Sequence, residues 1–182
     1  MKIGTKTLLF GNHQFLIHPF FVWLAWVKLY HRLPNWKEAV CILIHDWGYW
    51  GKPNIDGIEG ERHPAWAAAW AYKHFDYSRK GIHFSFKYRD LCAGHSVSFA
   101  RKYYYPISRL CLPDKVGVAL MPIPLMVLLG KLTGETREYR SCPKYAHTDY
   151  EKITDGEYYQ ALRDYYREIV IPGLKVVEDG KG

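Results

Sequence analysis

The chemistry that this chain can perform is first indicated by two adjacent residues, His45 and Asp46, near the end of an apolar segment. Burying an imidazole and a carboxylate side by side is unfavourable unless both groups are paired. A divalent metal ion removes that penalty because it binds a neutral imidazole and a carboxylate together. Adjacent helical side chains point about 100° apart, so both can reach one ion between them. The alternative is a core histidine followed by a solvent-facing carboxylate, and the dipeptide alone does not separate the two.

Other catalytic motifs are absent from the sequence. It contains neither a GxxxxGK[ST] nor a GxGxxG phosphate-binding loop, and Gly94-His95-Ser96 is not a nucleophile elbow. No two cysteines form a CxxC motif, which argues against a zinc or redox site built on them. We therefore expect Cys41, Cys92, Cys111 and Cys142 to be reduced, and the protein to be cytoplasmic. The short apolar stretch near the N-terminus predicts no signal peptide.

Several longer segments accompany the His-Asp pair. They are CILIHDWGY at 41–49, HDWGYWGKPNIDGIEGERHP at 45–64, SRLCLPDK at 108–115 and GETREY at 134–139. Together, over about residues 15–140, they resemble the HD-domain superfamily of metal-dependent phosphohydrolases, in particular small HD proteins of bacteria and phages. The family pattern is a first histidine on one helix, an apolar helix ending in His-Asp, and a distant aspartate on a later helix.

The resemblance implies a set of metal ligands. His18 matches the first histidine, His45 and Asp46 match the pair, and Asp114 matches the closing aspartate. His13 is an alternative first ligand, but the helix after His18 carries the apolar spacing of the family. Two imidazoles and two carboxylates suit a divalent transition metal such as Mn, Co, Ni, Zn or Fe.

Two further histidines, His63 and His95, extend the pattern, because some HD proteins use such residues for a second metal ion or the substrate phosphate. His63 precedes Pro64 at a predicted helix start, where the helix dipole favours the neutral, ligand-competent imidazole. The alternatives are a plain helix-start residue for His63 and a core or surface histidine for His95. No role is assigned to His31, His74, His83 and His147.

Candidates for catalysis and substrate binding lie near the same segments. Besides Asp46, the carboxylates of Glu61 and Glu59 could orient or deprotonate a metal-activated water. Basic side chains could pair with phosphate oxygens; the candidates are Lys52, Lys115 and Arg109, with Arg101 a weaker one. Trp47, together with Tyr49 and Trp50, could line a base or sugar pocket. The alternative for each is a solvated charge or a core aromatic residue.

The elements that must position these residues are predicted to be helices. Apolar spacing predicts helices over about 18–33, 35–47, 64–75, 87–103, 107–120 and 155–169. Asn35 with Glu38 resembles a capping box, and Thr154 is the expected cap of the last helix. Residues 81–88 are the one place for a short strand, and a loose tail is expected from 176 onward. The predicted fold class is all-α, a single-domain HD-domain bundle over residues 1–182, with its core at about 15–140.

Composition limits the partners. The chain has 182 residues, 48% of them hydrophobic, which excludes a disordered protein. The 25 Lys and Arg against 18 Asp and Glu give a net charge of +7, which favours anionic partners. The basic residues are scattered, so no specific nucleic acid is expected. The apolar stretches 19–27 and 117–129 are shorter than the roughly 20 residues of a membrane span, so no membrane partner is expected either.

The resemblance implies a phosphohydrolase that cleaves a phosphate ester or anhydride, of a nucleotide or deoxynucleotide, with water activated by one metal ion or two. Similar HD proteins dephosphorylate deoxynucleoside monophosphates or release triphosphate from deoxynucleoside triphosphates. A second hypothesis is a di-iron oxygenase that uses the ligand order His18, His45, Asp46, His63, His95 and Asp114. A third is a non-catalytic nucleotide-binding module. The aromatic-rich C-terminal helix could also join copies of the chain into a homo-oligomer.

Overall fold

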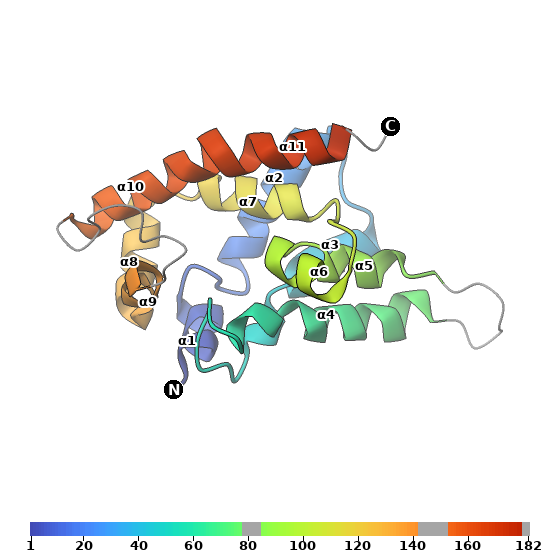
Figure 1. The fold of residues 1–182 in the computed structure, drawn as a ribbon, viewed down its shortest axis with the longest axis horizontal. Coiled ribbons are helices and arrows are strands. Elements are labelled where there is room, and N and C mark those ends of the chain that lie inside the picture. The colour runs from blue at the N-terminus through green and yellow to red at the C-terminus, as the bar shows by residue number, and fades with distance from the viewer. Residues whose placement is uncertain (78–84, 142–152, 180–182) are drawn as a thin grey trace.

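The computed structural model describes residues 1–77, 85–141 and 153–179, and all regular secondary structure in these ranges is helical (Figure 1). In chain order the elements are α1 (Ile3–Phe10), α2 (Ile17–Tyr30), α3 (Trp36–Ile44), η1 (Trp47–Tyr49), η2 (Gly60–Arg62), α4 (Pro64–Ala71), η3 (Tyr72–Asp76), α5 (Lys87–Ala93), α6 (Val97–Tyr103), α7 (Cys111–Leu120), α8 (Ile123–Thr133), α9 (Glu135–Ser141), α10 (Asp155–Tyr165), η5 (Tyr166–Val170) and α11 (Ile171–Asp179). The predicted all-α class is confirmed for these residues.

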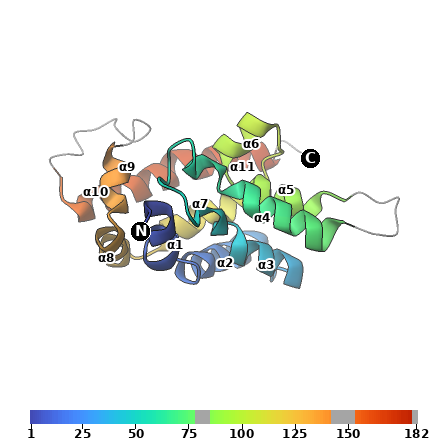
Figure 2. The same ribbon diagram turned by 90° about the horizontal axis from the view of Figure 1, so that it is seen from below.

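Among the described helices, α2 and α7 pack against each other more extensively than any other pair (Figure 2). Val22 and Trp26 of α2 are fully buried in this region. Gly117 of α7 permits the close approach, because a Cβ atom there would lie 2.9 Å from the backbone nitrogen of Val22. The contact holds the N-terminal turns of both helices together, and those turns carry His18 and Asp114.

Helix α3 starts at the capping box that its sequence predicts. Asn35 Oδ1 accepts the backbone N–H of Glu38 at 3.0 Å, and Glu38 Oε2 accepts the backbone N–H of Asn35 at 2.8 Å. The buried Glu38 carboxylate also accepts two hydrogen bonds from Arg32, at 2.7 and 2.8 Å. Cys41, Ile42 and Ile44 are buried on the opposite end of α3. The helix is thus fixed at its start and directs His45 and Asp46 inward at its end.

The prediction of one continuous helix over 87–103 is wrong. The chain forms α5, which ends at Ala93, and α6, which begins at Val97. Gly94 lies so close to the backbone of Pro106 that a Cβ atom would be 2.2 Å from its carbonyl oxygen. Ser96 then starts α6 by accepting the backbone N–H of Phe99. His95 therefore sits in a buried turn between two helices. The helix predicted over 107–120 likewise begins only at Cys111.

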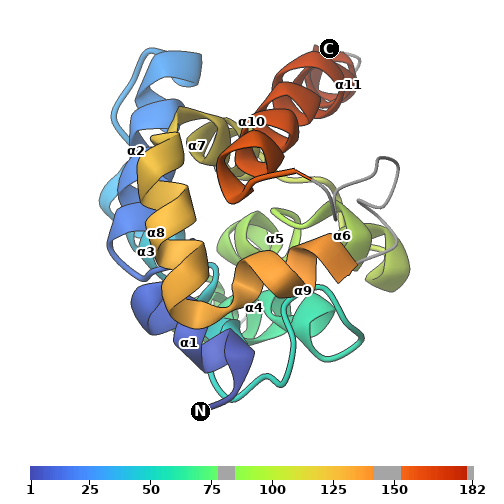
Figure 3. The ribbon, with the colours of Figure 1, turned by 90° about the vertical axis from the view of Figure 1, so that its left-hand side faces the viewer.

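The C-terminal helix starts as predicted and continues further than predicted. Thr154 and Glu157 form a capping box, but after Tyr165 the chain passes through the π-helical turn η5 into α11 (Figure 3). Leu174 is buried against α7, which explains why the helix continues to Asp179. The loose tail expected from 176 is therefore wrong for 176–179. Of the strand candidate at 81–88, residues 81–84 lie outside the described ranges, and Lys87 and Tyr88 belong to α5.

Two hydrophobic clusters form the main core. One joins α2, α3, α4 and α5 around Trp26, Cys41 and Ile42. The other joins α1, α8 and α10 around Met121, Met126 and Tyr159. Within residues 1–77, 85–141 and 153–179 no single helix is long and apolar enough to span a membrane, although α7 and α8 pass that test together as a pair bent by 99°.

The close approach of α7 to α2 gives a stability prediction. We expect Gly117→Ala to lower the free energy of unfolding by about 1–2 kcal/mol, because the new methyl group overpacks the contact with Val22. Gly173→Ala is the matched control, since no heavy atom lies within 4 Å of a Cβ placed there. That variant should be neutral or slightly stabilised by its better helix propensity. Urea unfolding measures both, and equal effects of the two substitutions would contradict this account of the packing.

Candidate metal centre

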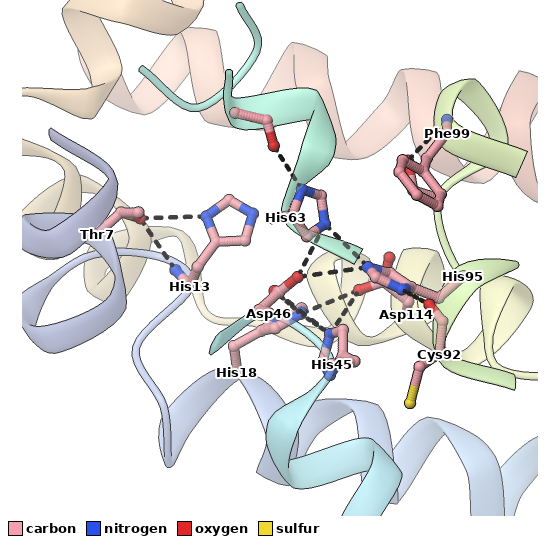
Figure 4. Close-up of polar contacts among 12 residues, drawn as sticks. Thr7, His13, His18, His45, Asp46, His63, Cys92, His95, Phe99 and Asp114 are labelled. Atoms are coloured by element: carbon pink, nitrogen blue, oxygen red, sulfur yellow. Dashed lines mark hydrogen bonds and ion pairs between the residues drawn. The ribbon is translucent and has the colours of Figure 1, made fainter. Parts of the chain in front are cut away.

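Six buried side chains from different parts of the fold converge in one place (Figure 4). They are His18 in the first turn of α2, His45 and Asp46 just after α3, His63 just before α4, His95 between α5 and α6, and Asp114 in the first turn of α7. Each therefore lies at a helix end or in an adjoining turn, where a short change in backbone direction can aim a side chain at a common point. Every metal ligand expected from the sequence is present in this cluster.

The first half of the cluster contains two histidines and two carboxylates. His18 Nε2 and His45 Nε2 are 3.2 Å apart. Asp46 Oδ2 lies 3.4 Å from the first nitrogen and 3.3 Å from the second. Asp114 Oδ1 lies 3.0 Å from His18 Nε2 and 3.6 Å from His45 Nε2. His18, His45 and Asp46 form one group that could hold a metal ion.

The second half uses the other oxygen of the same aspartate. His63 Nε2 and His95 Nε2 are 3.0 Å apart, and Asp46 Oδ1 lies 3.2 and 3.4 Å from them. These three residues form a second group that could hold a metal ion. The Asp46 carboxylate therefore lies between two histidine pairs and offers one oxygen to each.

Backbone carbonyl groups set the protonation of three of the histidines. In each case a carbonyl oxygen three residues earlier lies next to Nδ1, at 2.7 Å for His45, 2.8 Å for His63 and 2.6 Å for His95. A carbonyl only accepts, so Nδ1 must carry the proton, and in the neutral ring Nε2 is left with a lone pair. The lone pairs of His63 and His95 then face each other at 3.0 Å, an arrangement that a cation between them would stabilise. Nδ1 of His18 has no hydrogen-bond partner among the described residues.

The donor set fits a divalent transition metal. Zinc–nitrogen bonds are about 2.0–2.1 Å long, so neighbouring donor atoms around one ion lie about 2.8–3.4 Å apart in octahedral or tetrahedral geometry. The distances between donor atoms in both groups lie in or close to this range. Imidazole together with carboxylate suits Zn, Fe, Co, Ni and Mn.

The charges of the cluster favour a cation at its centre. Burial acts to raise the pKa of Asp46, but the neighbouring histidines hold it well below its usual value. Burial lowers the pKa of His45, yet Asp46 and Asp114 outweigh that effect and raise it to about 10. Burial lowers the pKa of His95 to about 4. Without a metal ion, a proton on His45 thus balances part of the carboxylate charge, while His95 stays neutral and free to bind.

A cavity of about 470 Å³ opens beside the cluster and is bordered by Asp46, His63, His95 and Asp114. Lys115 and Glu61, both expected from the sequence, also line it. Lys115 Nζ donates to Asp114 Oδ2 at 2.7 Å. Burial lowers the pKa of Lys115, but Asp114 raises it above its ordinary value, so the ammonium group remains charged. Arg101, the weaker candidate, lines the cavity as well.

Four residues expected to bind substrate or act in catalysis do not line this cavity. Lys52 and Glu59 form an ion pair at 3.7 Å. Arg109 lies over the ring of Tyr30, with 5.5 Å from the guanidinium carbon to the ring centre. Trp47 stacks on Trp66. In the segment after α3, Tyr49 and not Trp47 faces the cavity, because the η1 turn buries Tyr49 against the ring of His63.

The sequence analysis missed the other walls of the cavity. They include Asn12 after α1, Ser96 and Ser98 at the start of α6, Tyr139 of α9, and Tyr159, Leu162, Tyr165 and Tyr166 of the C-terminal helix. The apolar spacing that predicts the helix over 155–169 is the one signal that could have indicated that this helix contributes to the cavity wall. His13 is close to the cluster, but the two groups that could hold a metal ion contain His18 and not His13.

Comparison with protein-family models, with curated proteins and with solved structures finds no match to this chain. What is shown is an all-helical bundle with a buried histidine and aspartate cluster that could bind metal. The link to the HD-domain superfamily rests on the sequence segments described above.

The shared position of Asp46 makes a prediction about metal content. We expect the chain loaded with Zn²⁺ or Mn²⁺ to hold two ions, and His63→Ala to hold one, since only the second group loses a ligand. Asp46→Ala should lose most of both. His74→Ala is the matched control, because His74 is exposed and its ring contacts that of Trp70 at 4.4 Å between ring centres. Elemental analysis after dialysis measures the content. An Asp46→Ala variant that is folded and keeps two ions would contradict the shared role.

The raised pKa of His45 makes a prediction about pH. Because this pKa is about 10 in the metal-free chain, His45 is protonated at neutral pH and must release its proton to bind an ion. Metal affinity should therefore rise with pH by about tenfold per unit between pH 6 and 9. Calorimetry in buffers of different ionisation enthalpy counts the protons released. An affinity that does not change over this range would show that His45 is already neutral.

Proposed function

We propose that this protein is a metal-dependent phosphohydrolase that cleaves a phosphate ester or anhydride of a small molecule, with nucleotides as the favoured substrate class. The observation that carries the proposal is the Asp46 carboxylate shared by two histidine pairs at the wall of a cavity that also contains cationic side chains. When bound, divalent ions there would supply an activated water and neutralise charge on the phosphate.

Cationic groups of the cavity are suited to the remaining phosphate oxygens. Arg101 is exposed, lines the cavity and makes no ion pair with any described residue. Its planar guanidinium group can donate two parallel hydrogen bonds to a phosphate. Lys115 keeps its charge beside Asp114. It therefore orients the Asp114 carboxylate and adds positive potential to the part of the cavity next to Asp114.

Glu61 is the carboxylate best placed to receive a proton. It lines the cavity together with His63 and Asp46, whereas Glu59 pairs with Lys52 outside it. A carboxylate within reach of the water can orient it and accept its proton as the new bond to phosphorus forms. We assign this role to Glu61 and leave Glu59 without one.

The size and lining of the cavity support a small organic phosphate. Its volume of about 470 Å³ lies in the range of small-molecule sites. Its lining also includes apolar and aromatic side chains, among them Val118, Leu162 and Tyr165. Such a wall suits a nucleoside, whose flat base can pack on apolar and aromatic side chains.

A di-iron oxygenase is the second candidate, and the pairing of His63 with His95 around Asp46 is the observation that favours it. The same six side chains would serve either reaction. The guanidinium group of Arg101 and the ammonium group of Lys115 favour a phosphate-bearing substrate for the hydrolase and for the oxygenase alike. The reaction products therefore distinguish the two candidate functions. A nucleotide-binding module without catalysis would bind substrate and release nothing.

The proposal is tested with a panel of nucleoside mono-, di- and triphosphates in Mn²⁺, Co²⁺, Ni²⁺, Zn²⁺ and Fe²⁺, with products identified by chromatography. We expect phosphate, pyrophosphate or triphosphate release, reduced about 10³-fold or more in a folded Asp46→Asn variant. Oxygen consumption with two bound irons and no phosphate release would favour the oxygenase. Tight binding without turnover in any metal would favour the binding module.

A matched pair of arginine variants tests the substrate contact. Arg101→Met should raise KM about 10- to 100-fold, the effect of removing one hydrogen-bonding charge from a phosphate. Arg109→Met should leave KM unchanged, because Arg109 lies over Tyr30 and not at the cavity. The reverse result would place the phosphate at the side of the molecule that carries Arg109.

A further inference from the structure

We propose that His13 is a substrate-contacting residue, a hydrogen-bond donor through Nε2 to a phosphate oxygen at the histidine and aspartate cluster. The inference rests on the proposed phosphohydrolase function and adds to it a group that is not a metal ligand. It is carried by the position of the ring and by the partners of its two nitrogens.

The ring of His13 stands at the edge of the cluster and faces the cavity. Its centre lies 5.6 Å from that of His18 and 5.0 Å from that of Tyr49. Figure 4 shows the ring between Thr7 and His63, with one nitrogen turned toward Thr7 and the other toward the cluster. His13 lines the same cavity as Asp46 and Asp114.

Nδ1 of His13 is held by side-chain hydroxyl groups. Thr7 Oγ1 lies 3.1 Å from it, and the hydroxyl oxygen of Tyr139 lies 3.3 Å from it. Thr7 Oγ1 also accepts the backbone N–H of His13 at 3.4 Å. The ring is thus fixed from its far side, and Nε2 makes no hydrogen bond to any described residue.

This arrangement differs from that of His45, His63 and His95. There, a carbonyl oxygen, which can only accept, requires the proton on Nδ1. At His13 the partners of Nδ1 are hydroxyl groups, which can donate, and Thr7 already accepts one N–H. The Thr7 hydroxyl also has the Glu135 carboxylate as an acceptor, so we take the hydroxyl of Tyr139 as the donor to Nδ1, and the ring proton then resides on Nε2. We assign this opposite tautomer to His13, which makes Nε2 a donor toward the cavity.

A neutral donor suits the side of the phosphate that the ions do not contact. Metal ions at the cluster would contact only some of the oxygen atoms of a substrate phosphate. An N–H group that donates to one of the remaining oxygens stabilises its negative charge without binding a metal. A carboxylate at this position would repel the phosphate, and a second bare nitrogen would compete for an ion. The chemistry thus favours an anionic oxyacid ligand next to His13.

Two substitutions separate the roles of the two nitrogens. In His13→Asn the amide lies near the position of Nδ1 and keeps the contact with Thr7, but it does not reach the position of Nε2. In His13→Gln the amide reaches the position of Nε2. We expect kcat/KM and orthophosphate affinity to fall about 10- to 100-fold in His13→Asn, and to recover to within several-fold of the wild type in His13→Gln. Metal content and thermal stability should change little in either variant.

Several results would overturn the proposal, and one would overturn the proposed function alone. A His13→Asn variant with wild-type kcat/KM and orthophosphate affinity would show that Nε2 contacts no substrate. Loss of a metal ion in both variants would make His13 a ligand. If the wild type releases no phosphate from any ester, the proposed function fails, yet orthophosphate titration of the Zn²⁺-loaded chain still tests the contact. Long-range ¹H–¹⁵N spectra test the tautomer directly: a proton on Nε2 of His13 supports it, and a proton only on Nδ1 refutes it.

Discussion

The Asp46 carboxylate is the group on which the rest of the site depends, because its two oxygens face four imidazole rings inside the protein. Three of these rings have their Nδ1 protons committed to backbone carbonyl groups, so in their neutral form they present lone pairs to the carboxylate and to one another. Such a buried cluster is stable only when positive charge lies inside it. A proton on His45 supplies part of that charge in the metal-free chain, and metal ions would supply more.

The bundle can be understood as the means of gathering these groups. The contact between α2 and α7 through Gly117 brings His18 to Asp114, which are distant in the sequence. The capping box of α3 fixes the helix that delivers His45 and Asp46. The helix break at Gly94 turns the side chain of His95 toward the cluster. If the helix continued past Ala93, His95 would instead lie on the surface of that helix. The C-terminal helix then forms one wall of the cavity through Leu162 and Tyr165.

Local rules predicted the parts that depend on neighbouring residues. The Asn35 and Thr154 capping boxes, the start of α4 at Pro64 and the all-helical class follow from spacing and composition. The ligand set came from the resemblance to HD-domain proteins, and the structure places all six side chains together. The Gly94 break, the exclusion of Arg109 and the contribution of Tyr159 depend on contacts between residues far apart in the sequence, which no local pattern encodes.

The central claim is that one carboxylate holds two cations, each completed by a pair of histidines. Anomalous X-ray diffraction from crystals of the Zn²⁺-loaded protein, recorded at the zinc absorption edge, tests it most directly. We expect two peaks, one between Asp46, His18 and His45 and the other between Asp46, His63 and His95. The absence of a peak next to Asp46, or peaks only at surface histidines such as His74, would contradict the account.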